Sequence, residues 1–157
     1  MNTAALNVFI DFCHANLKRD NEILDYIKSR NLSIDTIKKW KLGSLPLDPD
    51  RLNLLLQKLQ PWSEETSTLL RYQHGGFESE FFNNRFIIPI LNQYGETVAV
   101  TGRTTATSEE QEQNKIVKYY NTVYSKTTQL FGLHQAIPTI IRTGEIIICE
   151  GNLDVIS

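Results

Sequence analysis

The chain has 157 residues, of which 41% are hydrophobic, and its 16 Lys and Arg against 18 Asp and Glu give a net charge of −2. This length suits one packed domain, or one domain with a piece of another, and the slight acidity argues against a protein that coats nucleic acid by bulk positive charge. No apolar run approaches the ~18 residues of a membrane-spanning helix and no signal pattern opens the chain, so we expect no membrane contact and a place in the cytoplasm.

The cysteines and histidines show no metal-binding pattern. Cys13 and Cys149 lie far apart in the sequence, each within an apolar segment. We therefore expect two buried, reduced thiols rather than zinc ligands or a disulfide. His14, His74 and His134 lack zinc spacing as well, so no zinc is expected in this chain.

The amino-terminal part of the chain is predicted to begin with three helices. Apolar side chains recur at helical spacing over 3–18 and again over 21–30. Asn31 is a suitable left-handed stop, because Asn accepts a positive φ better than most side chains. Ser33 is then the predicted N-cap of a short helix that Gly43 closes.

Two further helices are predicted before the middle of the chain. A loop that contains two prolines leads into a Leu-rich helix over 50–59. Ser63, which precedes two glutamates, is the predicted N-cap of a helix that runs to about Tyr72. Gly75 and Gly76 are expected to end it.

From residue 81 the apolar pattern becomes that of strands. Segments 85–91 and 97–101 are rich in apolar and β-branched residues and flank a Gly-containing turn at 92–96, which predicts a hairpin. Pro89 lacks a backbone N–H, so its strand should lie at an edge or contain a bulge.

The segments after the hairpin carry weaker patterns. The stretch 104–115 has no periodicity and no bulky apolar residue, which predicts a mobile loop. Segment 116–121 is predicted to be extended, and 128–136 to be a short helix in which Gly132 permits close packing. Helices followed by an antiparallel sheet and then an α/β unit predict the α+β fold class, with a boundary near 143–144.

The last residues carry the most specific pattern. The apolar run 146–149 predicts a buried strand that leads into Glu150, Gly151 and Asp154. Ligands of open α/β sheets bind beyond the carboxyl ends of strands, where a helix starting at this turn would let both carboxylates face one crevice. Two carboxylates are too few for Mg²⁺, so we expect a fragment, with further acids on strands that follow. Ordinary helix capping explains the same residues equally simply.

Five sequence blocks occur in an order that resembles one protein family. They are Tyr26 to Ser33 with Gly43 downstream, Phe82 to Ile90, Gly102-Arg103, Lys118 to Thr122 with Lys126 to Leu133, and Glu150 to Asp154. In these blocks the chain resembles the catalytic core of bacterial DnaG-type primases. The resemblance implies that residues 1–143 are the amino-terminal subdomain of that core and that 144–157 are the first strand and turn of a truncated Toprim α/β unit.

The resemblance implies part of an enzyme that synthesises short RNA primers on single-stranded DNA during DNA replication, by metal-dependent nucleotidyl transfer. The implied partners are the template, ribonucleoside triphosphates, the RNA primer and, through other regions, a replicative helicase. The implied cofactor is Mg²⁺ or Mn²⁺. Because one Glu and one Asp cannot complete a metal site, the isolated chain is expected to be nearly inactive as a polymerase.

The resemblance also implies roles for individual residues. Glu150 would be the catalytic acid, as general base or metal ligand, and Asp154 would support the metal. The other candidates would bind nucleic acid or nucleotide: Arg30, Arg103, Lys118 and Lys126 as a basic ridge, Tyr119 and Asn121 beside the incoming nucleotide, and Arg85 either at a phosphate or in a structural ion pair. By their pattern alone, these scattered Lys and Arg residues are typical of an ordinary solvent-exposed surface.

Some positions depart from the family pattern. Asn83 stands where the family usually has Arg or Lys, which removes one phosphate contact, and Thr101 and Val117 replace a common Gly and a frequent Pro. Two alternatives therefore stay open. One is a non-catalytic module of primase-like fold that binds single-stranded DNA or a replication protein. The other is a different Toprim enzyme, such as a topoisomerase or nuclease, although such an enzyme has no reason to carry the upstream Arg and Lys blocks.

Overall fold

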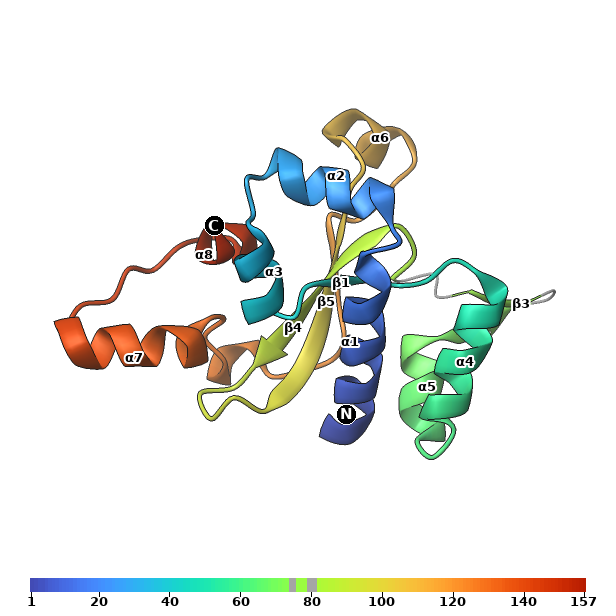
Figure 1. The fold of residues 1–157 in the computed structure, drawn as a ribbon, viewed down its shortest axis with the longest axis horizontal. Coiled ribbons are helices and arrows are strands. Elements are labelled where there is room, and N and C mark those ends of the chain that lie inside the picture. Colours follow the sequence, from blue (N-terminus) through green and yellow to red (C-terminus); the bar gives the residue numbers. More distant parts are fainter. Residues whose placement is uncertain (74–75, 79–81) are drawn as a thin grey trace.

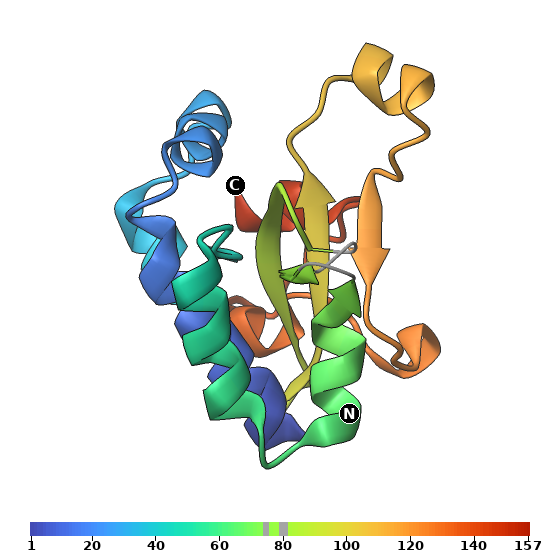
Figure 2. The ribbon, with the colours of Figure 1, turned by 90° about the vertical axis from the view of Figure 1, so that its right-hand side faces the viewer.

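The computed structural model describes residues 1–73, 76–78 and 82–157. A four-stranded antiparallel sheet in the order β1-β4-β5-β6 lies at its centre, with helices on both faces (Figure 1, Figure 2). Its strands are β1 (Gly43–Ser44), β4 (Arg85–Leu91), β5 (Thr97–Thr104) and β6 (Tyr119–Asn121). A separate antiparallel pair consists of β2 (Arg71–Gln73) and β3 (Gly76–Glu78). This mixture of helices and antiparallel strands confirms the predicted α+β class.

Helices precede, interrupt and follow the sheet. They are α1 (Thr3–Leu17), α2 (Asn21–Ser29), α3 (Ile34–Lys39), α4 (Pro49–Leu59), α5 (Ser63–Leu69), α6 (Ser108–Gln113), α7 (Leu133–Thr143) and α8 (Asn152–Ile156), with a 3-10 turn over Lys126–Thr128. Within the described ranges no helix has the length and apolar character needed to cross a membrane.

Two apolar clusters hold the helices against the two faces of the sheet. On one face, α1, α4 and α5 pack over Ile87 of β4 and Val100 of β5. On the other, α2, α3 and α8 pack over Phe86 and Ile88 of β4. We call these the α1 face and the α2 face. Because successive side chains of a strand point to opposite faces, the strand register decides which helices each sheet residue meets.

The first four helices each begin where the sequence places a short polar side chain. Asn2, Asp20, Ser33 and Asp48 accept hydrogen bonds from backbone N–H groups in the first turns of α1, α2, α3 and α4. These bonds satisfy donors that have no partner inside the helix. The predicted limits of α1, α2 and α4 are confirmed to within one residue.

Non-glycine residues with positive φ follow α2 and α3. Asn31 has a φ of 57°, which confirms the predicted left-handed stop. Lys41, with a φ of 47°, takes the place predicted for Gly43. That prediction was wrong because Gly43 lies in β1, where a Cβ would come within 2.7 Å of the carbonyl carbon of Cys13. The glycine serves the close approach of β1 to α1 rather than the end of a helix.

Pro89 lies in the part of β4 that has a partner strand on only one side in the described sheet. The residues of β4 that β1 pairs with are Phe86 and Ile87, so beyond them the described sheet offers no strand on that edge. A register shift follows between Ile90 and Leu91. Proline has no N–H to donate to a neighbouring strand, which is why an edge or a bulge was predicted here. Both features of β4 agree with that prediction.

Helix α5 differs from its prediction at both ends. Ser63 lies inside the first turn, and the N-cap is Trp62, whose side chain makes no capping hydrogen bond. The helix ends at Leu69 rather than near Tyr72, because the chain turns into β2, which pairs with β3. One predicted stop glycine lies in β3, and the other, Gly75, lies outside the described residues.

The predicted mobile loop at 104–115 contains helix α6, so that prediction was wrong. Thr107 and Glu110 form a capping box, in which the Thr107 N–H donates to Oε2 of Glu110 at 2.7 Å and the Glu110 N–H donates to Oγ1 of Thr107 at 3.2 Å. The backbone N–H of Thr107 lowers the pKa of the Glu110 carboxylate, and the Thr107 side chain lowers it further. Reciprocal capping stabilises a short polar helix without an apolar face, and Figure 2 shows α6 standing clear of the sheet.

Helix α7 starts later and runs further than the predicted helix at 128–136. Its N-cap is Gly132, with a φ of 80°, and it continues through Pro138 to Thr143. A Cβ on Gly132 would lie 2.5 Å from Cγ1 of Val155 in α8. This contact confirms the predicted close packing at Gly132.

The buried strand predicted at 146–149 is not formed. The segment has no helix or strand assignment, and Ile147 is 89% exposed. An apolar run becomes a strand only where a sheet edge accepts its backbone groups, and the described strands at the two edges, β1 and β6, do not pair with it. Cys149 is therefore exposed, whereas Cys13 is buried as predicted.

The two thiols should differ sharply in reactivity. Burial raises the pKa of the Cys13 thiol far above its usual range, and the thiolate is the form that reacts. We expect iodoacetamide at pH 8 to alkylate Cys149 and leave Cys13 unmodified in the folded protein, and to alkylate both in denaturant, as mass spectrometry would measure. Rapid modification of Cys13 without denaturant would contradict the packing of α1.

Candidate nucleic-acid interface

The pairing of β5 with β6 gathers three of the predicted site residues on one face of the sheet. Arg103 lies opposite Tyr119, and Thr101 lies opposite Asn121. Arg103 also lies opposite Phe86 of β4, whose side chain belongs to the α2 face. Because residues directly opposite each other share a face, Arg103, Tyr119 and Asn121 all lie on the α2 face.

Helix α2 adds an aromatic ring and a second guanidinium. Cζ of Arg103 lies 5.3 Å from the ring centroid of Tyr26 and 5.7 Å from that of Tyr119. Cζ of Arg30, which follows α2, lies 5.3 Å from the same Tyr26 ring. We call these four residues the Arg–Tyr stack. Each cation–π contact contributes about 0.5–2 kcal/mol, more where water is excluded.

Arg103 is buried without full hydrogen bonding. It is 8% exposed, and its Nε and Nη1 atoms have no hydrogen-bond acceptor among the residues that the structure describes. The hydroxyl of Tyr26 is likewise buried and has no hydrogen-bond partner among the described residues. Buried donors are nearly always paired, and a lost pairing costs about 1–3 kcal/mol or more for a charged group. An anionic ligand would satisfy the two free donors of Arg103.

Arg85 lies on the other face of the sheet. Its Nη1 donates to the carbonyl oxygen of Val117 at 2.9 Å and to that of Gly102 at 3.3 Å. Burial lowers the pKa of its guanidinium. Its hydrogen bonds tie β4 to β5 and to the segment before β6, and among the described residues it has no carboxylate partner. Its Nη1 contacts are therefore made with backbone carbonyl groups within the fold, and the choice between a phosphate and a structural ion pair stays a prediction.

The two predicted lysines of the ridge are exposed. Lys118 directly precedes Tyr119, and its carbonyl oxygen accepts a hydrogen bond from the Thr104 N–H at 3.1 Å, which extends the pairing of β5 with the chain. Lys126 lies in the 3-10 turn beyond β6. Neither lysine is in a salt bridge with any described residue, so both ammonium groups are available to a ligand.

Glu150 and Asp154 flank the start of α8. Both are exposed. Ile156 belongs to the apolar cluster of the α2 face, so α8 packs on the face that carries the Arg–Tyr stack. Across residues 1–73, 76–78 and 82–157, no three His, Cys, Asp or Glu side chains lie close enough together to hold a metal ion. That the Glu150 and Asp154 carboxylates face one crevice therefore stays a prediction, in which further ligands would have to complete a metal site.

Tyr26 is the residue that sequence reasoning missed. It belongs to the first family block, but it has no predicted role. One local signal was available, since Tyr26 and Arg30 are four residues apart and a helix places such residues on one face. The contact with Arg103 has no local signal, because it depends on α2 covering this face of the sheet.

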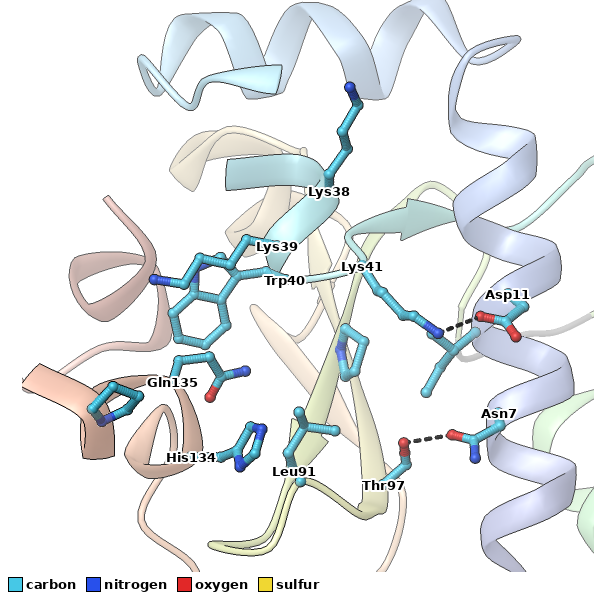
Figure 3. Close-up of a pocket in the computed structure, with 14 residues that line it drawn as sticks. Asn7, Asp11, Lys38, Lys39, Trp40, Lys41, Leu91, Thr97, His134 and Gln135 are labelled. Carbon is cyan, nitrogen blue, oxygen red and sulfur yellow. Dashed lines mark hydrogen bonds and ion pairs between the residues drawn. The ribbon is translucent and has the colours of Figure 1, made fainter. Parts of the chain in front are cut away.

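A separate pocket of about 620 Å³ lies between α1, the end of α3, the β4–β5 hairpin and α7 (Figure 3). The Lys41 ammonium pairs with Asp11 at 2.8 Å, and Lys38 points away from the other labelled side chains. A Cβ on Gly95 would lie 2.7 Å from Cε1 of His134, so the imidazole packs on the hairpin backbone. None of the predicted site residues lines this pocket.

The sequence matches the family described as DNA primase catalytic core, N-terminal domain, over residues 12–137. The DNA primase of Treponema pallidum (strain Nichols) is 33% identical over 139 residues, which cover 84% of this chain and 21% of that protein. The chain thus spans about a fifth of the length of the first curated relatives it matches.

Solved structures give the same result. The structure of the zinc-binding and RNA polymerase domains of Aquifex aeolicus primase superposes with a TM-score of 0.81 at 27% identity, over 98% of this chain and 38% of that one. The RNA polymerase domain of Mycobacterium tuberculosis primase DnaG, in complex with a double-stranded DNA oligomer with a 6-nucleotide overhang, gives a TM-score of 0.70 at 26% identity, over 89% and 44%. With its fold and four-fifths of its sequence thus matched, this chain belongs to the family of the DNA primase catalytic core, N-terminal domain.

Proposed function

We propose that this chain is the part of a DNA primase that holds nucleic acid beside the polymerising site, in a protein that makes RNA primers on a single-stranded DNA template. The observation that carries the proposal is Arg103, which is buried between two tyrosine rings with two nitrogen atoms left without acceptors in the described part of the chain. A phosphate oxygen matches a guanidinium in both charge and geometry. The Mycobacterium tuberculosis domain named above is described in complex with DNA, which supports a nucleic-acid ligand here.

The basic ridge of this proposal follows β5, β6 and the end of α2. Its members are Arg30, Arg103, Lys118 and Lys126. Arg103 would bind a phosphate from within the stack, and the exposed lysines would follow a flexible backbone as point charges. Tyr119 and Asn121, which share the α2 face with Arg103, would position the incoming ribonucleotide. Arg85 is assigned a structural role, because its Nη1 already donates to two carbonyl oxygens.

Metal-dependent nucleotidyl transfer belongs to the same proposal. Glu150 and Asp154 supply carboxylate oxygens, the ligands that Mg²⁺ or Mn²⁺ prefers. Oδ2 of Asp154 lies 2.6 Å from the place that a Cβ on Gly151 would take, so any side chain there would displace it. Gly151 therefore lets the Asp154 carboxylate lie against the backbone of the turn that follows Glu150 in the chain. In this proposal Glu150 and Asp154 would hold the ion, with further ligands completing its coordination. The ion would neutralise phosphate charge, and Glu150 would act as general base toward the primer hydroxyl.

The comparisons favour this function over another Toprim enzyme, one of the two alternatives left open by the sequence. The match over 12–137 lies upstream of Glu150, in the blocks that a topoisomerase or nuclease has no reason to carry. The proposed partners are the template, ribonucleoside triphosphates and the RNA primer in the cytoplasm, with a replicative helicase engaged through other regions of the protein.

Binding of single-stranded DNA should be weak and strongly salt-dependent. Each phosphate contact to a single strand contributes about −0.7 to the slope of log K against log salt. We expect Arg103→Met to weaken binding of a fluorescent oligothymidine about tenfold or more, because a charge-assisted hydrogen bond is lost, and Lys118→Met to weaken it by a smaller factor. Fluorescence anisotropy across a salt series measures both the affinity and the slope.

The matched control is Lys58→Met, which removes an exposed lysine from α4 on the opposite face. It should leave both affinity and slope unchanged. Salt-independent binding, or wild-type binding by both Arg103→Met and Lys118→Met, would contradict the ridge.

A further inference from the structure

We infer that Tyr26 is a positioning residue, whose neutral ring holds the guanidiniums of Arg103 and Arg30 in the orientation in which they meet phosphate. The inference rests on the proposed function, since it concerns how that ridge binds. Tyr26, an uncharged side chain of α2, would thereby determine how many cationic contacts the protein makes with a nucleic-acid backbone.

The Tyr26 ring is fixed by packing. Ile23 and Ile27 on the same helix are almost fully buried in the cluster of the α2 face, and Tyr26 packs against that cluster. Its ring lies 6.2 Å from that of Phe86 of β4, at an interplanar angle of 57°. The ring is therefore tied to both the helix and the sheet, and it offers a rigid surface to whatever rests on it.

An arginine on a strand is not fixed in the same way. The backbone of β5 places the Cα of Arg103, but its long side chain retains its rotamer freedom unless other groups confine it. Here the rings of Tyr26 and Tyr119 confine the guanidinium from α2 and from β6. A flat guanidinium stacks on aromatic rings through its face. Its N–H groups lie in the guanidinium plane, so stacking leaves them free to donate hydrogen bonds at its edge.

The hydrogen bonding of Arg103 differs from that of a structural arginine. A guanidinium that only held the fold together would donate to carbonyl oxygens, as Arg85 does. Nε and Nη1 of Arg103 instead have no acceptor within the described chain. The stack thus orients donors without using them, and a group that is oriented in advance loses less entropy when its ligand arrives. Arg30 rests on the same ring from the end of α2, so one tyrosine serves two cations.

The test replaces the ring without changing any charge. Tyr26→Leu should weaken oligothymidine binding about tenfold, the effect expected when a desolvated cation–π interaction is removed. It should also reduce the salt slope by about 0.7 for each phosphate that the variant no longer binds. Tyr26→Phe keeps the ring and should bind as the wild type does. Tyr94→Leu is the matched control, since Tyr94 is a 76% exposed tyrosine at the hairpin turn, and it should change nothing.

The salt slope separates positioning from a merely structural role. A general loss of folded protein lowers the amount of active protein but leaves the slope of the remaining binding unchanged. A wild-type slope for Tyr26→Leu would therefore overturn the inference. So would equally weakened binding by Tyr26→Phe and Tyr26→Leu, because the hydroxyl rather than the ring would then be responsible.

A double mutant shows through which residue Tyr26 acts. If the ring works through Arg103, combining Tyr26→Leu with Arg103→Met should weaken binding by clearly less than the product of the two single effects. The full product would mean that Tyr26 acts independently, which contradicts positioning. If Arg103→Met alone leaves binding unchanged, the ridge of the proposed function fails first, and the two failures are thereby distinguished.

An NMR measurement on the wild-type chain covers the case in which Tyr26→Leu does not fold. The Nε–H proton of Arg103 should resonate away from the position of a free arginine side chain because of the two rings. Tyr26→Phe should retain that displacement. A free-arginine position in the wild-type spectrum would overturn the inference without any variant.

Discussion

Phe9→Ala is expected to lower the free energy of unfolding by about 3–5 kcal/mol, the range measured for removing a fully buried phenylalanine. The side chain of Phe9 is 0% exposed and lies in the apolar cluster of the α1 face. Its ring lies 5.6 Å from that of Phe82, so alanine would leave a cavity between α1 and the sheet. Small domains are stable by about 5–15 kcal/mol, so roughly a fifth or more of the total would be lost.

Thermal unfolding followed by circular dichroism measures this loss. At about 2–4 °C per kcal/mol for a chain of this size, the midpoint should fall by roughly 6–20 °C. The control is Leu54→Ala on α4, where the side chain is 50% exposed, and its effect should stay within about 1 kcal/mol. A Phe9→Ala midpoint equal to that of the control would refute the packing of α1 on the sheet.

Gly43→Ala is expected to destabilise the protein by about 1–3 kcal/mol or more, although it adds a single methyl group. A Cβ at this position would lie 2.7 Å from the carbonyl carbon of Cys13, 2.8 Å from the backbone nitrogen of His14 and 2.9 Å from Cβ of Cys13. Two of these atoms belong to the backbone of α1, which cannot move aside as a flexible side chain would. Either α1 or β1 must shift, and β1 is paired with β4.

The comparison variant is Gly144→Ala at the end of α7. Gly144 has a φ of 71°, but nothing lies within 4 Å of the place that a Cβ would take there, so its cost of about 1 kcal/mol or more comes from backbone strain alone. Alkylation of Cys13 distinguishes the two causes. Gly43→Ala should expose the buried thiol to iodoacetamide, whereas Gly144→Ala should not. A protected Cys13 together with an unchanged midpoint in Gly43→Ala would show that the contact with α1 is looser than described.

Local signals in the sequence predicted most of the helices and the hairpin. An N-cap such as Ser33 acts on backbone groups within three residues, so its effect is readable without knowledge of the fold. The same is true of the left-handed stop at Asn31. The missed helix α6 carried such a signal in Thr107 and Glu110, but its lack of an apolar face concealed it, because apolar periodicity is the stronger indicator of a helix.

Predictions failed where an element depends on a distant partner. The run 146–149 has the composition of a buried strand, yet a strand needs a neighbour for its backbone groups, and composition does not say whether one is present. Gly43 has the sequence context of a residue that ends a helix. In the structure a glycine is needed there because the backbone of α1 leaves no room for a side chain. In both cases the residue types were informative, but the contact that gives them meaning lies elsewhere in the chain.

In the candidate site, too, the sequence predicted local properties but not the contacts between distant residues. Residue order and type were sufficient to recognise the family and to propose Arg30, Arg103 and Lys118 as cationic contacts, because charge is a property of the side chain alone. Sequence could not reveal that Arg85 lies on the opposite face from Arg103, or that Tyr26 stacks on Arg103. Those facts follow from strand register and from which face α2 covers, and both are set by the burial of apolar side chains that are far apart in the sequence.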